Sequence, residues 1–227
     1  MKWTEVVEMD FDIEFVEGAR IGGSGGSLDI GGVDANLQVL RNPANGEPYL
    51  PGSSLKGKLR STLEKEHGLG KNGKPCGCGS STCPVCRIFG AHMNPRPESG
   101  PSRLTVRDAM FTEAYRKQWK DRRIEGEPVL EIKTENTINR SSGTAENPRT
   151  GERILPGATF KAQIILRIYE GDKREEMVKN ISHSLAVIER FDSLGAAGSR
   201  GSGRIKIHNF SSKPVALAGV TLTDVTP

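Results

Sequence analysis

The chain has 227 residues, of which 35% are hydrophobic, so it can bury one substantial core and favours a single elaborated domain. Its net charge of +4 arises from 32 Lys and Arg against 28 Asp and Glu, a balance too even to identify a nucleic-acid-binding protein by itself. An acidic N-terminal segment and the lack of any run of roughly 18 apolar residues argue against a secretory signal and a membrane span, and predict a cytoplasmic protein.

The first predicted strand covers residues 9–15, where apolar residues alternate with acidic ones. It ends at Gly18. A segment rich in Gly, Asn and Asp then runs from Gly22 to Gly46 with few apolar anchors. So long a connection is either functional or disordered, and we expect a functional loop.

The clearest predicted helix follows this loop. Its apolar positions recur at four-residue spacing and are Leu55, Leu59 and Leu63. We expect it to begin after Pro51, with Ser53 or Ser54 as the N-cap, and to end at Gly68.

The remaining predicted elements are strands at 103–111, 129–134 and 160–168, a helix at 173–191 and a last strand at 204–210. With insertions removed, the order is strand, helix, strand, strand, helix, strand. This order predicts an α+β protein with the ferredoxin-like, RRM-like βαββαβ core. Because that core serves many functions, we expect the insertions to carry the functional information.

One insertion, at residues 67–100, contains all four cysteines: Cys76, Cys78, Cys83 and Cys86. Four thiolates in a Gly-rich loop of a protein in a reducing compartment predict a closed, structural Zn²⁺ site. The Cys76-x-Cys78 spacing is tight, so His67 is an alternative ligand. The other interpretation is four free thiols in a loose loop.

The start of the first helix resembles a phosphate-binding loop, because Gly52 to Lys58 fits most of the pattern G-x-x-x-x-G-K-[ST]. Leu59 stands where the Mg²⁺-binding hydroxyl is needed, so we reject a nucleotide triphosphatase. A helix N-terminus with nearby cations still suits backbone phosphates of RNA. The candidate residues are Ser53, Ser54, Lys56, Lys58 and Arg60. The alternative is a solvated basic face.

A glycine-rich stretch at 195–204 precedes the last strand. Its small residues would let the backbone approach a ligand, and Arg200 and Arg204 could grip phosphate beside Ser199. The alternative is a mobile helix-to-strand turn.

The second insertion, at residues 135–157, is polar and rich in turn-forming residues, and it predicts a long projecting hairpin. Asn136, Arg140 and Arg149 are its candidate RNA contacts, and Ile138 could wedge between bases. A plain solvated loop explains the composition equally well.

Taken together, five segments resemble the RAMP superfamily, and their order and spacing are most similar to the backbone subunit of the type III-A CRISPR effector, the Csm complex. The segments are 49–60, 83–90, 103–108, 135–140 and 198–204. The resemblance extends from the first strand to Phe210. It implies a single domain in which residues 135–157 form a thumb-like hairpin that kinks a guide RNA.

The resemblance also implies partners and an activity. The expected partners are a CRISPR guide RNA, a paired target RNA, further copies of the chain and other type III subunits. No membrane is expected among the partners. Family members cut the target with one acidic residue in a loop after a Gly-Gly pair, which here is Asp34. Arg20 stands where the family commonly has His and retains a phosphate-binding role.

RNA supplies its own nucleophile, the 2′-OH, so a sparse site suffices. Asp34 could hold Mg²⁺ or a similar divalent ion, or accept the 2′-OH proton, and the sequence leaves both open. A lone Asp among glycines is otherwise a turn former. Two other functions compete with this one. The chain could be a non-cleaving scaffold subunit of a type III-A or III-D effector, or a zinc-stabilised nucleic-acid-binding domain that works alone.

Overall fold

The computed structural model describes residues 2–22, 37–70 and 72–217. In chain order its elements are β1 (Trp3–Phe15), α1 (Gly52–Glu66), α2 (Pro84–Phe89), β2 (Leu104–Val106), β3 (Met110–Phe111), α3 (Glu113–Ile124), β4 (Leu130–Ile138), β5 (Ala145–Ile154), β6 (Thr159–Tyr169), α4 (Arg174–Phe191), a short 3₁₀ helix (Gly198–Arg200) and β7 (Ile205–Ala216).

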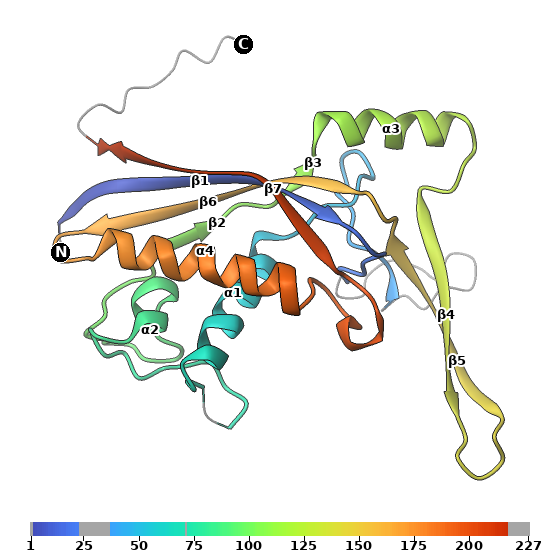
Figure 1. The fold of residues 1–227 in the computed structure, drawn as a ribbon, viewed down its shortest axis with the longest axis horizontal. Coiled ribbons are helices and arrows are strands. Elements are labelled where there is room, and N and C mark those ends of the chain that lie inside the picture. Colours follow the sequence, from blue (N-terminus) through green and yellow to red (C-terminus); the bar gives the residue numbers. More distant parts are fainter. Residues whose placement is uncertain (1, 23–36, 71, 218–227) are drawn as a thin grey trace.

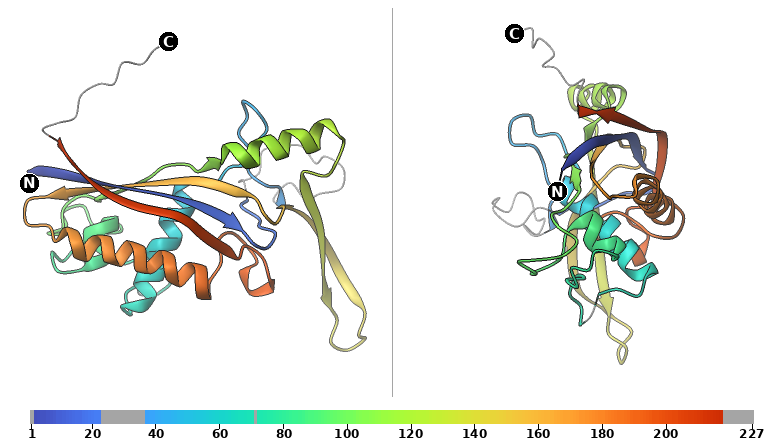
Figure 2. Two further views of the ribbon diagram at one scale, coloured as in Figure 1. Left: turned by 45° about the horizontal axis from the view of Figure 1, so that its top comes forward. Right: turned by 90° about the vertical axis from the view of Figure 1, so that its left-hand side faces the viewer.

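The main sheet has the strand order β2-β6-β1-β7, with β3 also paired to β6, and the pairs are antiparallel. With the insertions removed, this is the strand order of the ferredoxin-like core, so the predicted fold class is confirmed. Figures 1 and 2 show α1, α2 and α4 on one side of the sheet and α3 on the other, while the β4–β5 hairpin projects from one end. None of the described helices is long and apolar enough to cross a membrane.

The core forms from the apolar residues that recur at regular intervals along the strands and helices. The apolar β1 residues predicted to face inward are at most 2% exposed, and they pair in register with the buried apolar residues of β6. Leu55, Leu59 and Leu63 of α1 are at most 1% exposed and cover the same face. A period of two on the strands and about four on the helices therefore sets the layers.

The opposite face of β1 carries four half-buried carboxylates, Glu8, Asp10, Asp12 and Glu14. Neighbouring strands hold three of them: Gln163 donates to Asp10 (2.9 Å), Asn209 to Asp12 (2.8 Å), and His208 hydrogen-bonds Glu14 (2.6 Å). RNA-recognition domains stack bases on this face of their sheet. A central row of acids repels phosphate, so RNA contacts are expected elsewhere on this chain.

The start of α1 corrects the predicted cap. Pro51 occupies the N-cap position without a side-chain bond, and Asp108 accepts the backbone N–H of Gly52 at 2.7 Å in place of Ser53 or Ser54. A Cβ at Gly52 would collide with the carbonyl of Val106, so only glycine fits. Asp108 thus joins the helix to the chain after β2.

Two predicted strands also change. The strand expected at 103–111 is two short strands, β2 and β3, and the last strand continues past Phe210 to Ala216, still paired with β1. Helices α2 and α3 were not predicted. For α3 the sequence held a usable signal, because Thr112 caps Tyr115 N–H and the apolar Tyr115 and Trp119 lie four residues apart.

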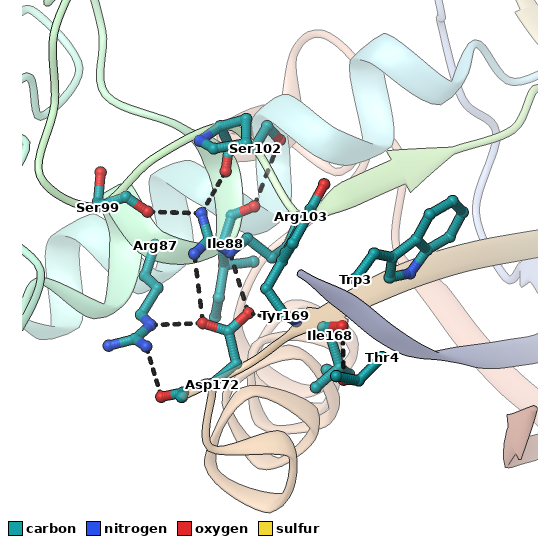
Figure 3. Close-up of polar contacts among 12 residues, drawn as sticks. Trp3, Thr4, Arg87, Ile88, Ser99, Ser102, Arg103, Ile168, Tyr169 and Asp172 are labelled. Carbon is teal, nitrogen blue, oxygen red and sulfur yellow. Dashed lines mark hydrogen bonds and ion pairs between the residues drawn. The ribbon is translucent and has the colours of Figure 1, made fainter. Parts of the chain in front are cut away.

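A buried ion-pair network joins the β6–α4 turn to the cysteine-containing insertion (Figure 3). Asp172, whose side chain is fully buried, accepts from Arg87 Nε (2.9 Å), Arg103 Nε (3.1 Å) and the backbone N–H of Tyr169 (3.0 Å). Burial alone would raise the pKa of Asp172, but hydrogen bonds from Arg103, Tyr169 and Arg87 outweigh it and hold the pKa below its usual range. Arg103 is itself 1% exposed, so neither charge has an alternative partner in water.

We expect Asp172→Asn to lower the free energy of unfolding by about 3–5 kcal/mol at pH 7, because it leaves a buried arginine without its counter-charge. Since the folded-state pKa is depressed, the carboxylate stabilises the fold above the unfolded-state value near 3.9 and loses this effect as pH falls through the folded pKa. Urea unfolding from pH 7 to pH 3 measures both effects. Glu175→Gln, at an exposed carboxylate on the first turn of α4, is the control and should leave stability unchanged. A constant difference between the two variants across this pH range would contradict the prediction.

Candidate metal centre and nucleic-acid interface

The four cysteines converge on one point. Their sulfur atoms lie within 4.8 Å of one another, with Sγ–Sγ distances of 3.6 Å for Cys76–Cys78, 3.7 Å for Cys78–Cys86 and Cys76–Cys86, and 4.0 Å for Cys76–Cys83. A tetrahedron with Zn–S bonds of about 2.3 Å has edges of about 3.8 Å. The donor set therefore fits a zinc-binding loop. Among the described residues, His67 is not part of this cluster.

Burial shapes the protonation of the cluster. Burial raises the pKa of Cys83, and it raises that of Cys86 far above the usual range, whereas a hydrogen bond from the backbone of Ser80 lowers that of Cys78. Thiolates are the metal-binding form of cysteine. A divalent ion would supply the positive charge that buried thiolates need.

Local structure explains how the ligands are presented. Cys83 is the N-cap of α2 and accepts the backbone N–H of Cys86 at 3.4 Å, so a Cys-x-x-Cys turn points both sulfurs inward. Cys76 is fixed by α1: Glu64 accepts its N–H (2.8 Å) and Arg60 donates to its carbonyl (2.7 Å). Arg60 also bonds Glu64 at 2.8 Å. These contacts favour a structural role for Arg60 at the metal loop over the RNA contact that we predicted.

We expect Arg60→Ala to weaken metal binding roughly 10- to 100-fold, because the side chain orients the backbone of a ligand residue. Competition of the purified protein with a chromophoric chelator, using Zn²⁺ at fixed pH, measures the affinity. Lys65→Ala, at an exposed lysine on the same helix, is the matched control. Equal affinities for the two variants would show that Arg60 does not support the site.

A second constellation lies at the base of the β4–β5 hairpin, around a pocket of about 320 Å³. Four residues predicted to bind RNA line it together, although they come from three distant segments: Arg20, Asn136, Arg149 and Arg200. Lys133 and Arg153 add further cations that sequence reasoning missed. The alternation of β4 places Lys133 on the pocket side, which the sequence could have indicated.

Acidic residues hold these cations in position. Arg200 Nε donates to Glu135 Oε2 (3.0 Å), and Lys133 lies 3.4 Å from the same carboxylate. Burial alone would raise the pKa of Glu135, but the charges of Arg200 and Lys133 outweigh it and lower the pKa. The arginine is 59% exposed, so its outer face remains accessible to an anion.

The glycine-rich stretch owes its composition to the protein's own backbone. A Cβ at Gly195 would collide with the carbonyl of Arg20, and one at Gly203 with the carbonyl of Leu194, and both glycines have positive φ. Gly203 N–H and Ser202 Oγ both donate to the carbonyl of Gly18. The stretch is therefore tied to the end of β1, which argues against a mobile turn and sets Arg200 beside the hairpin.

A wider pocket of about 550 Å³ lies on the α4 side of this stretch. Lys58, Ser199 and Arg204, three of the predicted RNA contacts, line it. Lys58 is engaged by Asp192 at 2.6 Å, whereas Arg204 is exposed. Phe191, at the end of α4, is 77% exposed on the rim, and sequence reasoning treated it only as a helix end.

The remaining predicted RNA contacts line neither of these two pockets. Ser53 and Ser54 are exposed on the first turn of α1, and Arg140 is exposed in the turn between β4 and β5. Lys56 donates to Ser102 Oγ and the Leu104 carbonyl, both at 3.1 Å, and burial, followed by the nearby charges of Arg60 and Arg167, lowers its pKa. Its contacts favour a link between α1 and β2 over an RNA contact. Asp34 lies outside the described residues.

Comparison with known proteins gives a consistent result. The family model described as the RAMP superfamily matches residues 12–206. The chain is 39% identical over 206 residues to the CRISPR system Cms endoribonuclease Csm3 of Methanothermobacter thermautotrophicus, covering 85% of this chain and 79% of that protein. It is 40% identical over 205 residues to the protein of the same name from Methanocaldococcus jannaschii, covering 87% and 76%.

Solved structures agree in fold. The chain aligns with the Csm3–Csm4 subcomplex of the type III-A CRISPR-Cas interference complex with a TM-score of 0.61 and 25% identity, covering 96% of this chain and 83% of that one. It aligns with a chain of the type III-B Cmr-beta complex bound to cognate target RNA with a TM-score of 0.61 and 21% identity, covering 93% and 61%.

Proposed function

Because the chain belongs to the RAMP superfamily and, within it, to the Csm3 family, we propose that it uses the surface around its projecting hairpin to hold guide RNA while it cuts the paired target. It is a Csm3-type endoribonuclease of a type III-A CRISPR effector and cleaves target RNA. The observation that carries the proposal is the similarity to Csm3 endoribonucleases over most of the chain, together with four predicted RNA contacts in one pocket.

The guide RNA is the first proposed ligand. Arg149, Arg20 and Arg200 surround the pocket at the hairpin base, and exposed guanidinium groups bind phosphate bidentately. The carboxylates of β1 make this face of the sheet an unfavourable surface for RNA. The strand ends and the hairpin are therefore the proposed binding surfaces. We propose that residues 135–157 act as a thumb-like hairpin on one RAMP domain, with further copies of the chain and other type III subunits assembled along the guide.

We expect Arg149→Ala to weaken guide binding and to reduce the slope of log K against log salt by about 1, because one phosphate contact is lost. Filter binding of guide RNA across a salt series measures both quantities. Arg96→Ala is the control, since this exposed arginine follows α2 in the cysteine-containing insertion, and Figure 1 shows α2 at the end of the molecule away from the β4–β5 hairpin. An unchanged slope for Arg149→Ala would remove that residue from the interface.

The cleavage step is proposed to use the RNA's own 2′-OH. Its oxygen attacks the adjacent phosphorus and the bond to the 5′-oxygen breaks. The leaving 5′-oxygen takes a proton from water, so the products carry a 2′,3′-cyclic phosphate and a 5′-hydroxyl. Asp34 is the proposed carboxylate, which accepts the 2′-OH proton or binds Mg²⁺ or a similar divalent ion. Such an ion would neutralise charge at phosphorus. The guide-paired geometry supplies the in-line arrangement.

We expect Asp34→Ala to abolish target cleavage by the assembled complex while guide and target binding persist. Cleavage of a labelled target is followed with Mg²⁺ and with chelator, and a target with a single 2′-deoxy residue at the cut site tests the nucleophile. Asp29→Ala, at the other aspartate of the same segment, is the control. Full cutting by Asp34→Ala would remove Asp34 from the mechanism, and no cutting by the native chain would favour the scaffold function.

The metal centre is proposed to hold Zn²⁺ as a structural ion. Four protein thiolates leave no open coordination position, so the ion would not act in cleavage. Its expected effect is to order the insertion at residues 67–100 against α1. The catalytic divalent ion is a separate proposal, linked to Asp34 alone.

A further inference from the structure

The pocket at the base of the β4–β5 hairpin carries more cations than its own carboxylates balance. Five cationic side chains line it: Arg20, Lys133, Arg149, Arg153 and Arg200. Two carboxylates line it as well, Glu135 and Glu152. Glu152 is engaged outside this group, because it accepts the backbone N–H of Val39 and pairs with Arg41. Glu135 is therefore the carboxylate that faces the cations of the pocket.

Both oxygens of the Glu135 carboxylate contact cations. Oε2 accepts from Arg200 Nε at 3.0 Å, and Oε1 lies 3.4 Å from Lys133 Nζ. One anionic group thus bridges two cations through two oxygens, and the non-bridging oxygens of an RNA phosphate can bridge the same two side chains. The carboxylate therefore occupies cations that the proposed guide contact needs.

Local structure brings these groups to one face of the hairpin. Lys133 and Glu135 are two residues apart on β4, so their side chains point to the same side. Their cross-strand neighbours on β5 are Gly151 and Arg149, respectively. A Cβ at Gly151 would lie 3.5 Å from Arg20 Nη1, so the glycine leaves room for that arginine on the same face. Glu135 is thus surrounded by the cations of three distant segments.

The strand becomes irregular immediately after Glu135. The register of β4 against β5 shifts between Glu135 and Thr137, and Asn147 of β5 has a positive φ of 54° or less, at 51°. As a result three consecutive residues, Glu135, Asn136 and Thr137, line the pocket, which a regular strand with alternating side chains would not allow. Bulges of this kind are typical beside functional sites, where they re-aim a side chain.

The Glu135 carboxylate is charged and can leave its partners. Burial would raise its pKa, but the charges of Arg200 and Lys133 outweigh that effect and lower the pKa, so the group is ionised at neutral pH. Its side chain is 35% exposed and that of Arg200 is 59% exposed. Ion pairs with this exposure are weak, so an incoming phosphate can replace the carboxylate, which then turns towards water.

We propose that Glu135 is an internal competitor for the RNA phosphate at this pocket. In the free protein its carboxylate holds Arg200 and Lys133, and on binding a phosphate group of the RNA takes over both cations. The inference rests on the proposed function, because guide RNA is the anion that enters the pocket. Glu135 thereby lowers the affinity of the pocket for an RNA phosphate and keeps its cations paired until RNA arrives.

Filter binding of guide RNA to the full-length chain, at fixed salt and neutral pH, tests the proposal. Glu135→Gln keeps the shape of the side chain and removes its charge. We expect it to bind guide RNA about three- to tenfold more tightly, because no exposed ion pair has to be broken and no carboxylate repels the phosphate. Its melting temperature should not exceed the native value, since the free protein loses an ion pair. A residue that only positions Arg200 would instead lower the affinity when it is removed.

Glu146→Gln is the matched control, since it removes one negative charge from the same hairpin at an exposed position that bonds Asn139. Its affinity for guide RNA should stay within about twofold of the native value. Arg200→Ala and the double variant Glu135→Gln/Arg200→Ala complete a double-mutant cycle. We expect the gain from Glu135→Gln to fall below about twofold in the Arg200→Ala chain, because the contact for which Glu135 competes is then absent. Glu135→Ala replaces Glu135→Gln if that variant does not fold.

The outcomes separate this inference from the proposed function. Unchanged or weaker guide binding by Glu135→Gln overturns the competitor role, and so does an equal gain in Glu146→Gln or an undiminished gain without Arg200. If Arg149→Ala and Arg200→Ala weaken guide binding while Glu135→Gln does not strengthen it, the proposed guide surface stands and the inference fails. If neither arginine variant weakens guide binding, the proposed placement of the guide at this pocket fails, and the inference fails with it.

Discussion

The alternation of β1 is the constraint on which the rest of the molecule depends. One face of this central strand is apolar and forces α1 and α4 onto the same side of the sheet. The other face carries four carboxylates that repel a polyanion. This face therefore disfavours a nucleic acid on the surface that RNA-recognition domains use, and our proposal places RNA where β1 ends, at Gly18 and beyond.

At that end, backbone pairing assembles the site from three distant segments. The carbonyl of Gly18 receives two hydrogen bonds from the glycine-rich stretch, and Ala19 pairs with Ile154 at the hairpin base. Arg20, the next residue, bridges to Ala196. Three consecutive residues of β1's extension thus bring the cations of the hairpin and of the glycine-rich stretch to one pocket, without needing a large apolar contact between them.

The sequence predicted the elements that depend on a local periodicity, and it did not reveal contacts between residues that are far apart in the chain. Strand and helix alternation gave β1, α1, β6 and α4 because each buries one face at a regular interval. Lys56 and Arg60, which we predicted as RNA contacts, donate to the carbonyls of Leu104 and Cys76, contacts that sequence spacing does not reveal. Cysteine spacing predicted the metal centre because four thiolates in one short loop have few other arrangements.

The placement of α1 divides the molecule into two functional ends. The C-terminal half of the helix holds the metal loop through Arg60 and Glu64, while Lys58 in its N-terminal half lines the pocket near Arg204. The ion pairs of Asp172 stiffen the metal-loop end, and the hairpin at the other end is joined to the core by few residues. The ion pairs of Asp172 thus lie away from the hairpin end, which we propose to face the guide RNA. At the hairpin end, Glu152 adds a side-chain contact to this backbone pairing, because its carboxylate accepts the backbone N–H of Val39 and Arg41 Nη2.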